Sequence, residues 1–110
     1  MRQFELYWAQ LPEPVGRRPV LLLSRTPAYA YLSRFMVAEV TTHPRLIPQE
    51  IALGRREGLA QPSVANLDHV HMVDRNRVGE RIGAVGRARE IEVKRALGHA
   101  LGWPELKELE

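Results

Sequence analysis

The stretch Gly16-Arg17-Arg18-Pro19-Val20-Leu21-Leu22-Leu23-Ser24-Arg25 decides how the rest of the chain is interpreted. Its apolar run, Val20–Leu23, has the length of a strand that is buried on both faces. Pro19 can begin such a strand, because its missing N–H then lies outside the hydrogen-bonded ladder. Arg18 is therefore expected just before a rigid element, where its guanidinium can be aimed at a phosphate. The alternative is a solvated surface arginine.

The composition is that of one globular domain. The chain has 110 residues, of which 45% are hydrophobic and 26% are charged, both ordinary proportions for such a domain. No window approaches the roughly 18 apolar residues that span a bilayer, and the N-terminus does not resemble a signal peptide. We therefore expect a cytoplasmic protein with no membrane partner, made of a single domain over residues 1–103 and an acidic tail over residues 104–110.

Charge and cysteine content narrow the possible partners and cofactors. The net charge is +3, and most of the 16 basic residues are arginine. Arginine suits bidentate contact with phosphate, which points to nucleic acid, although genomic base composition can enrich arginine equally well. The absence of cysteine excludes disulfides and thiolate metal sites. The four histidines lack metal-binding spacing apart from the His69-x-His71 pair, which would need further ligands, so no metal or cofactor is expected.

The periodicity of apolar residues predicts a mainly β fold. Strands are predicted over residues 4–11, 19–24, 34–42, 49–53, 63–73 and 79–85, with a single helical turn beginning near Pro27. One clear amphipathic helix is predicted over Gly86–Leu101, where Gly102 and Pro104 end it. Because a sheet of six or seven such short strands tends to curl, the expected fold is a β-barrel with one packed C-terminal helix.

Four segments, taken in order, resemble the MazF/PemK/Kid toxins of bacterial toxin–antitoxin systems. They are Gly16–Ser24, Val37–Thr42, Ser63–Asp74 and Arg77–Gly83, and a final helix ending in Ala100-Leu101-Gly102 completes the likeness. The resemblance covers residues 4–103. It implies an SH3-like barrel of the type shared with CcdB toxins, a symmetric homodimer and a cognate antitoxin whose disordered segment wraps the dimer.

The resemblance also implies an activity. Members of this family are metal-independent, sequence-specific endoribonucleases that cleave single-stranded RNA at short sequences by attack of the 2′-hydroxyl, leaving 2′,3′-cyclic phosphate and 5′-hydroxyl ends. Their catalytic arginine lies in an Arg-Pro-Val motif, which places that role on Arg18. Their catalytic threonine corresponds to Thr41, and Thr42 takes the place of a serine. Read as an ordinary sequence, Thr41 is also simply a β-branched residue that fits a strand.

Three further residues are candidates for RNA contact, and each of them also has an ordinary structural explanation. Arg17 is either a phosphate-positioning residue or a solvated arginine. His69 and His71 stand where the family usually has glutamine and arginine, and they can stack on bases or shuttle protons. The alternative is one core histidine and one surface histidine. The loop Pro12–Arg17 is shorter than in many members, so the RNA sequence preference is expected to differ.

Two other functions compete with a ribonuclease toxin. One is a gyrase-binding poison of the CcdB type, which would use the same fold without cleaving RNA. The other is a catalytically inactive paralogue that still binds antitoxin, an option that the altered strand with His69 and His71 keeps open. The Arg-Pro-Val motif together with Val40-Thr41-Thr42 favours the ribonuclease, and residues 104–110 show no match to a gyrase-binding end.

Overall fold

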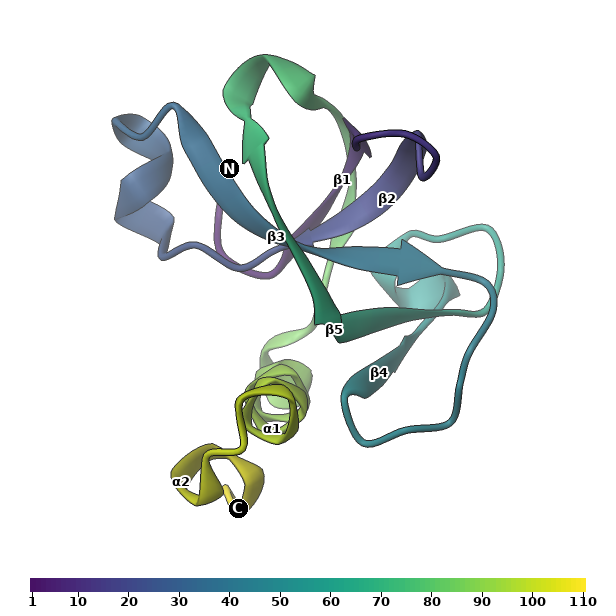
Figure 1. The fold of residues 1–110 in the computed structure, drawn as a ribbon, viewed down its shortest axis with the longest axis vertical. Coiled ribbons are helices and arrows are strands. Elements are labelled where there is room, and N and C mark those ends of the chain that lie inside the picture. Colours follow the sequence, from purple (N-terminus) through teal and green to yellow (C-terminus); the bar gives the residue numbers. More distant parts are fainter.

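Six antiparallel strands form one strongly curled sheet, and two helices follow it at the C-terminus (Figure 1). The computed structural model describes all residues 1–110. The sheet order is β4-β5-β3-β2-β1-β6. The prediction of a mainly β fold with a C-terminal helix is confirmed. The strands are β1 Glu5–Gln10, β2 Arg17–Leu22, β3 Arg34–Thr41, β4 Glu50–Leu53, β5 Ser63–Asp74 and β6 Val78–Ala84; the helices are α1 Glu90–Leu101 and α2 Pro104–Lys107; the 3₁₀ turns are η1 Thr26–Ala30, η2 Arg55–Glu57, η3 Arg75–Arg77 and η4 Arg87–Arg89.

Strand β2 begins two residues earlier than predicted, so that Arg18 lies inside the strand and not before it. The hairpin to β1 is tight, with the Leu11 N–H donating to the Gly16 carbonyl at 2.9 Å, and pairing therefore continues out to Gln10 opposite Arg17. The ladder to β3 starts only at Val20. A proline at position 19 is tolerated because it precedes that second ladder. Arg18 is thereby held by a paired backbone.

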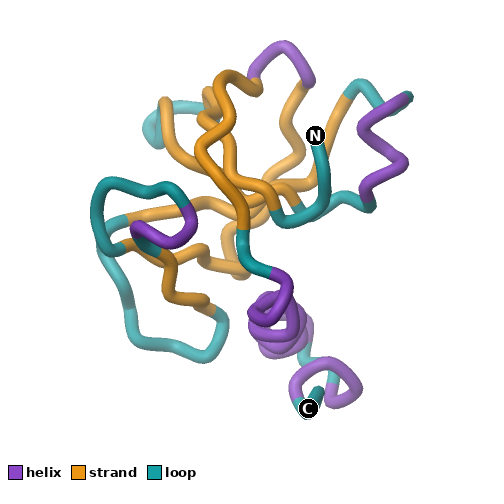
Figure 2. The backbone as a smooth tube through the Cα atoms, turned by 180° about the vertical axis from the view of Figure 1, so that it is seen from behind, coloured by secondary structure: helices purple, strands orange, loops and turns teal.

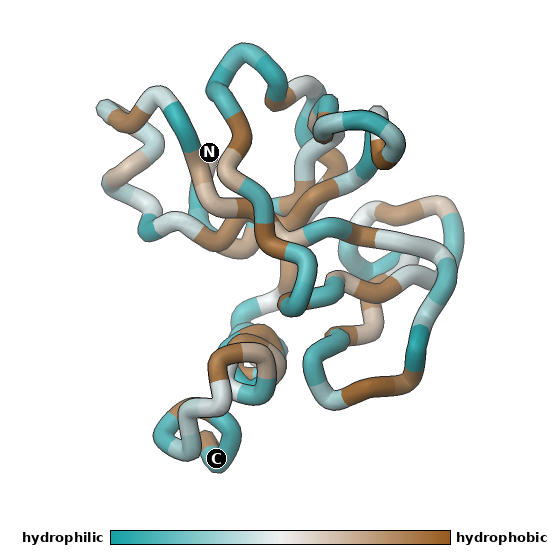
Figure 3. Tube along the Cα trace, in the orientation of Figure 1, coloured by the Kyte–Doolittle hydropathy of each residue, from teal (hydrophilic) through white to brown (hydrophobic).

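Apolar side chains cover both faces of β2, as its sequence predicted. On one face Leu21 joins a cluster that includes Val93 of α1. On the other face Val20 and Leu22 join a second cluster around Phe35. The hydropathy colouring shows this apolar centre where the strands cross (Figure 3). Burial on both faces makes β2 a rigid support for the residues at its N-terminal end.

The two edge strands, β4 and β6, do not pair with each other, and a loop brings the edges together instead (Figure 2). Gly58 ends η2 with φ +94°, and a Cβ at this position would lie 2.3 Å from the Ile82 carbonyl oxygen of β6. Only glycine combines this backbone conformation with so close an approach. The barrel is therefore completed by a packed loop and not by a closed ladder of hydrogen bonds.

An ionic cluster around the buried Glu57 joins α1 to this loop. Glu57 is only 4% exposed, and its Oε1 accepts the Gly54 N–H at 2.7 Å. Arg89 lies 3.3 Å from the Glu57 Oε2 and also donates to Glu92 at 2.8 Å and to the Ala52 carbonyl at 2.6 Å. The hydrogen bond from Arg89 lowers the pKa of Glu92. This cluster fixes the start of the helix against β4 and η2.

Residues 104–110 fold back onto α1 through the short helix α2. Gly98 provides the space, because a Cβ there would lie 2.6 Å from the Leu106 Cβ and 2.6 Å from the Lys107 backbone nitrogen. The Arg95 Nε donates to the Leu109 carbonyl. Neither helix has the length and apolar character that would be needed to cross a membrane.

Because the phenol of Tyr29 is buried, the free energy of unfolding should change with pH in the alkaline range. Tyr29 is 6% exposed, and burial raises its pKa from 10.0 to about 12. The unfolded chain therefore loses this proton first, so the free energy of unfolding should fall between about pH 10 and 12, by up to about 2–3 kcal/mol. Urea unfolding of wild type and Tyr29→Phe across this range measures the difference. Equal pH slopes for the two proteins would contradict it.

Candidate active site

Three charged or titratable side chains from three neighbouring strands lie in a row on one face of the sheet. Arg18 of β2 places its Nη1 3.8 Å from the Glu39 Oε1 of β3. The other carboxylate oxygen of Glu39, Oε2, lies 3.1 Å from the Nε2 of His71 on β5. The side chains of Arg18, Glu39 and His71 are 35%, 13% and 26% exposed. The row is thus anchored within the sheet at Glu39 but open to a ligand at the arginine and at the histidine.

Thr41 belongs to the same face as this row. Val20 pairs with Glu39, and the same register continued by two residues places Arg18 opposite Thr41. Directly opposed residues of neighbouring strands have Cβ atoms about 5 Å apart. The Thr41 Oγ1 accepts the His43 N–H at 3.2 Å, which fixes the hydroxyl at the end of β3. The two residues expected to be catalytic therefore lie on the same face of neighbouring strands.

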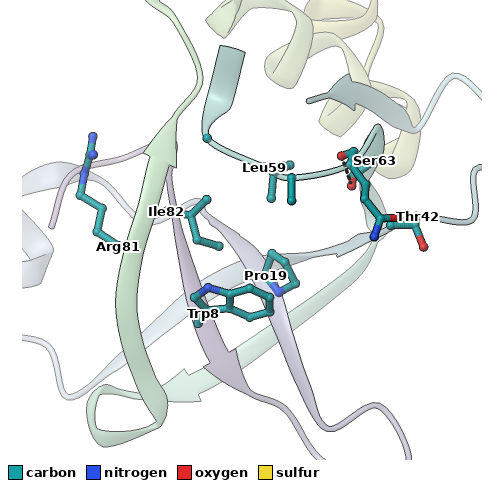
Figure 4. Close-up of a pocket in the computed structure, with 10 residues that line it drawn as sticks. Trp8, Pro19, Thr42, Leu59, Ser63, Arg81 and Ile82 are labelled. Atoms are coloured by element: carbon teal, nitrogen blue, oxygen red, sulfur yellow. Dashed lines mark hydrogen bonds between the residues drawn. The ribbon is translucent and has the colours of Figure 1, made fainter. Parts of the chain in front are cut away.

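Arg17 and Thr42 lie on the opposite face, because successive strand residues alternate. The Arg17 guanidinium stacks 4.1 Å from the centre of the Trp8 ring. Trp8 is partly exposed and lines a pocket of about 440 Å³ together with Thr42. We call this feature the Trp8 pocket; its labelled residues in Figure 4 are Trp8, Pro19, Thr42, Leu59, Ser63, Arg81 and Ile82.

The Trp8 pocket has an apolar floor and a polar side. In Figure 4, Trp8, Leu59 and Ile82 surround its centre, whereas Ser63 and Thr42 lie together at one side. Arg81 turns away from the centre and donates to the Glu5 Oε2 at 2.7 Å. That hydrogen bond contributes to lowering the pKa of Glu5, against the opposing effect of burial. The pocket therefore offers an aromatic surface and hydroxyl groups, but no free charge of its own at the centre.

In a regular strand His69 and His71 would lie on the same face, but β5 is not regular at His69. The pairing of β3 with β5 jumps from Ala38–Val70 to Glu39–Asn66, so residues 67–69 form an irregularity in β5. His69 lies in this irregularity and makes no side-chain hydrogen bond, in contrast to His71. Glu39 was not among the residues predicted for the site. Its place in the sequence could have indicated it, because Glu39 stands two residues before Thr41 and strand residues two apart lie on the same face.

Residues 2–101 match the family described as the PemK-like, MazF-like toxin of type II toxin–antitoxin systems. The chain belongs to this family. The resemblance in the sequence is thereby confirmed. Among curated proteins, endoribonuclease MazF3 of Mycobacterium tuberculosis is 33% identical over 88 residues, covering 78% of this chain and 85% of the relative. The probable endoribonuclease MazF5 of the same organism is 34% identical over 91 residues, covering 82% and 80%.

Solved structures of MazF proteins share the fold. The Mycobacterium tuberculosis toxin MazF-mt6 superposes with a TM-score of 0.84 at 31% identity, covering 89% of this chain and 96% of that chain. The MazE–MazF structure from Deinococcus radiodurans gives a TM-score of 0.74 at 27% identity, covering 93% and 95%. The curled sheet and α1 are thus features that this MazF-family protein has in common with its relatives.

The site of this MazF-family protein combines groups suited to a phosphodiester. A guanidinium can neutralise phosphoryl oxygens with paired hydrogen bonds, and the opposing threonine hydroxyl can donate or accept. An imidazole held by a carboxylate can transfer a proton. No three histidine, aspartate or glutamate side chains lie close enough together to hold a metal ion.

Proposed function

We propose that this protein is the toxin of a type II toxin–antitoxin system that cleaves single-stranded RNA in the cytoplasm without a metal ion. The attacking group is the 2′-hydroxyl next to the scissile phosphodiester, and the products are a 2′,3′-cyclic phosphate and a 5′-hydroxyl. The observation that carries the proposal is that Arg18 lies on the same face of the sheet as Glu39 and therefore as Thr41, two residues farther along β3, in a chain of the MazF family. Endoribonuclease relatives at one-third identity support the activity.

The two catalytic residues have separate tasks in this reaction. Charge builds on the phosphoryl oxygens as the 2′-oxygen attacks, and Arg18 stabilises it with a guanidinium that stays protonated, as arginine does in proteins. Thr41 donates its hydroxyl to a phosphoryl oxygen or orients the 2′-hydroxyl. Neither task requires a nucleophile from the protein, because RNA supplies its own.

We propose that single-stranded RNA passes over the edge formed by the start of β2 and the end of β3. At this edge Arg18 and Thr41 lie on one face of the sheet, and Arg17 and Thr42 lie on the other. Arg17 and the Trp8 ring offer a cation and an aromatic plane, the combination on which unstacked bases and their phosphates bind. Thr42 adds a hydroxyl at the Trp8 pocket. His69 and His71 extend the contact along β5. Stacking on Trp8 is the contact that explains a preference for single strands.

The partners that we propose are a second copy of the chain and an antitoxin. Met36 and Met72 face each other across β3 and β5 and are 46% and 49% exposed, with Val70 at 40% beside them. Such an apolar patch on a sheet suits a homodimer contact. The MazE–MazF structure from Deinococcus radiodurans supports binding of an antitoxin.

Thr41→Val should slow RNA cleavage by about 10–100-fold, because it keeps the branched shape and removes only the hydroxyl. The effect is expected to be smaller than at Arg18, since hydrogen bonds from a charged donor are about twice as strong. Thr41→Ser keeps the hydroxyl and serves as the matched variant, with cleavage close to wild type. Turnover that is unchanged in Thr41→Val would refute the role.

A substrate with one altered sugar tests the proposed chemistry. A short RNA that carries a 2′-deoxyribose on the 5′ side of the cut should bind but remain intact, because the attacking oxygen is missing. The matched all-ribose RNA should give a 2′,3′-cyclic phosphate in the presence of EDTA, as read by mass spectrometry. Cleavage of the deoxy substrate, or a requirement for metal, would contradict the proposal.

A further inference from the structure

The carboxylate of Glu39 connects the proposed phosphate-binding arginine to a histidine. One of its oxygens lies 3.8 Å from the Arg18 Nη1, and the other lies 3.1 Å from the His71 Nε2. Only 13% of the Glu39 side chain is exposed, whereas 26% of His71 is exposed. Glu39 is thus enclosed between two partners, and the imidazole keeps an edge open to solvent. A surface histidine without a function would not need a largely buried carboxylate to orient it.

We propose that His71 is the general base of the RNA cleavage reaction and that Glu39 is the positioning residue that orients it. The proposal rests on the ribonuclease function described above. It gives the reaction the proton acceptor that Arg18 and Thr41 do not supply, because an arginine stays protonated and a threonine hydroxyl is a poor base.

The hydrogen bond to Glu39 determines which nitrogen of His71 is free. A carboxylate only accepts hydrogen bonds, so Nε2 carries the proton and the lone pair of the neutral ring lies on Nδ1. The Nδ1 atom takes the proton of the 2′-hydroxyl while the 2′-oxygen forms its bond to phosphorus. The bond from phosphorus to the 5′-oxygen breaks, the 5′-oxygen takes a proton from solvent, and His71 then returns its own proton to solvent.

The geometry places the imidazole beside the phosphate that Arg18 binds. His71 pairs with Val37, and Glu39 follows two residues later on the same face of β3. The guanidinium and the imidazole are therefore separated by a single carboxylate, and both keep an exposed edge on this face. The charged group in contact with His71 is Glu39 on β3, which also pairs with Arg18 on β2. The other titratable residues of the neighbouring positions on its own strand are Asp68, His69 and Asp74, and Asp74 pairs with Arg34 at 3.3 Å.

The first test compares single-turnover cleavage rates of wild type and His71→Gln across pH. The wild-type rate should rise from acidic to neutral pH, because a general base accepts a proton only in its unprotonated form. His71→Gln should cleave about 10²–10⁴-fold more slowly at the top of this range, as expected for a lost general base, and its rate should lack the rise. His99→Gln, on α1 and outside the site, should behave as wild type.

The second test uses Glu39→Gln, which should change binding and cleavage in opposite directions. Removing a negative charge beside the phosphate should tighten binding of an uncleavable 2′-deoxy RNA, while cleavage should slow by roughly tenfold because the ring loses its orienting charge. Added imidazole should restore part of the rate to His71→Ala but not to Arg18→Ala. Recovery of this kind is not expected from a histidine that only supports the strand.

Two outcomes would overturn the proposal that His71 is the general base and would leave the proposed ribonuclease function intact. In one, wild type cleaves RNA and His71→Gln keeps both its rate and its pH profile. In the other, His71→Gln weakens binding and cleavage equally at every pH, which makes His71 an RNA-binding residue only. If wild type leaves every RNA intact, the proposed function fails first, and the inference fails with it.

Discussion

Replacing Arg18 with alanine is expected to slow RNA cleavage by about a thousandfold while weakening RNA binding by less than tenfold. The reason is that we propose Arg18 as the group that stabilises the reacting phosphodiester, whereas the proposed RNA contacts of Arg17 and Trp8 lie on the other face and remain in this variant. Single-turnover cleavage and the Kd for an uncleavable 2′-deoxy RNA measure the two effects separately.

Arg18→Lys distinguishes charge from geometry. Lysine keeps the positive charge but lacks the planar fork of donors, so this variant should recover binding and only part of the rate. Arg34→Ala removes an exposed arginine that pairs with Asp74, and it serves as the control for loss of one cation. Equal losses of binding and cleavage in Arg18→Ala would contradict a catalytic role and leave Arg18 as a binding residue.

Arg89→Leu is expected to lower the free energy of unfolding by about 3–5 kcal/mol, because it leaves the buried Glu57 carboxylate without its cationic partner. Glu57 then retains only the Gly54 N–H, and the loop that completes the barrel loses its tie to α1. Urea unfolding at neutral pH measures the loss.

Two variants test the cause of this loss. Arg87→Leu lies two residues away, is exposed and takes part in no ion pair, so its stability should stay within about 0.5 kcal/mol of wild type. Adding Glu57→Gln to Arg89→Leu removes the stranded charge and keeps an oxygen for Gly54, so the double variant should be more stable than Arg89→Leu alone. A double variant that is less stable would show that the loss arises from packing and not from charge.

The fold was predictable wherever apolar periodicity and turn residues act locally. The apolar run that begins at Val20 predicted the buried central strand β2, although that strand ends at Leu22 and not at Ser24, and Gly102 predicted the end of α1. The start of β2 was missed because Arg17 and Arg18 have no apolar signal and are held by pairing to β1. The contact of Gly58 with Ile82 joins segments that are distant in the chain, and a glycine at a turn does not reveal its partner.

The candidate site was predictable in its residue types but not in its connections. The motif around Arg18 and the threonine at the end of β3 were evident from the resemblance. The ion pair that places Glu39 between Arg18 and His71 depends on the register of three strands and on the irregularity at residues 67–69. The apolar alternation around Trp8 gives no sign that its face of the sheet is left open as a pocket.

The central claim is metal-independent, sequence-specific cleavage of single-stranded RNA at the Arg18–Thr41 site. The most direct measurement is a map of cut positions, by primer extension, on a long and sequence-diverse RNA incubated with purified wild type or Arg18→Ala in EDTA. We predict discrete cuts that share one short sequence in wild type and disappear in Arg18→Ala. An RNA left intact by wild type, or the same cuts in both proteins, would contradict the account.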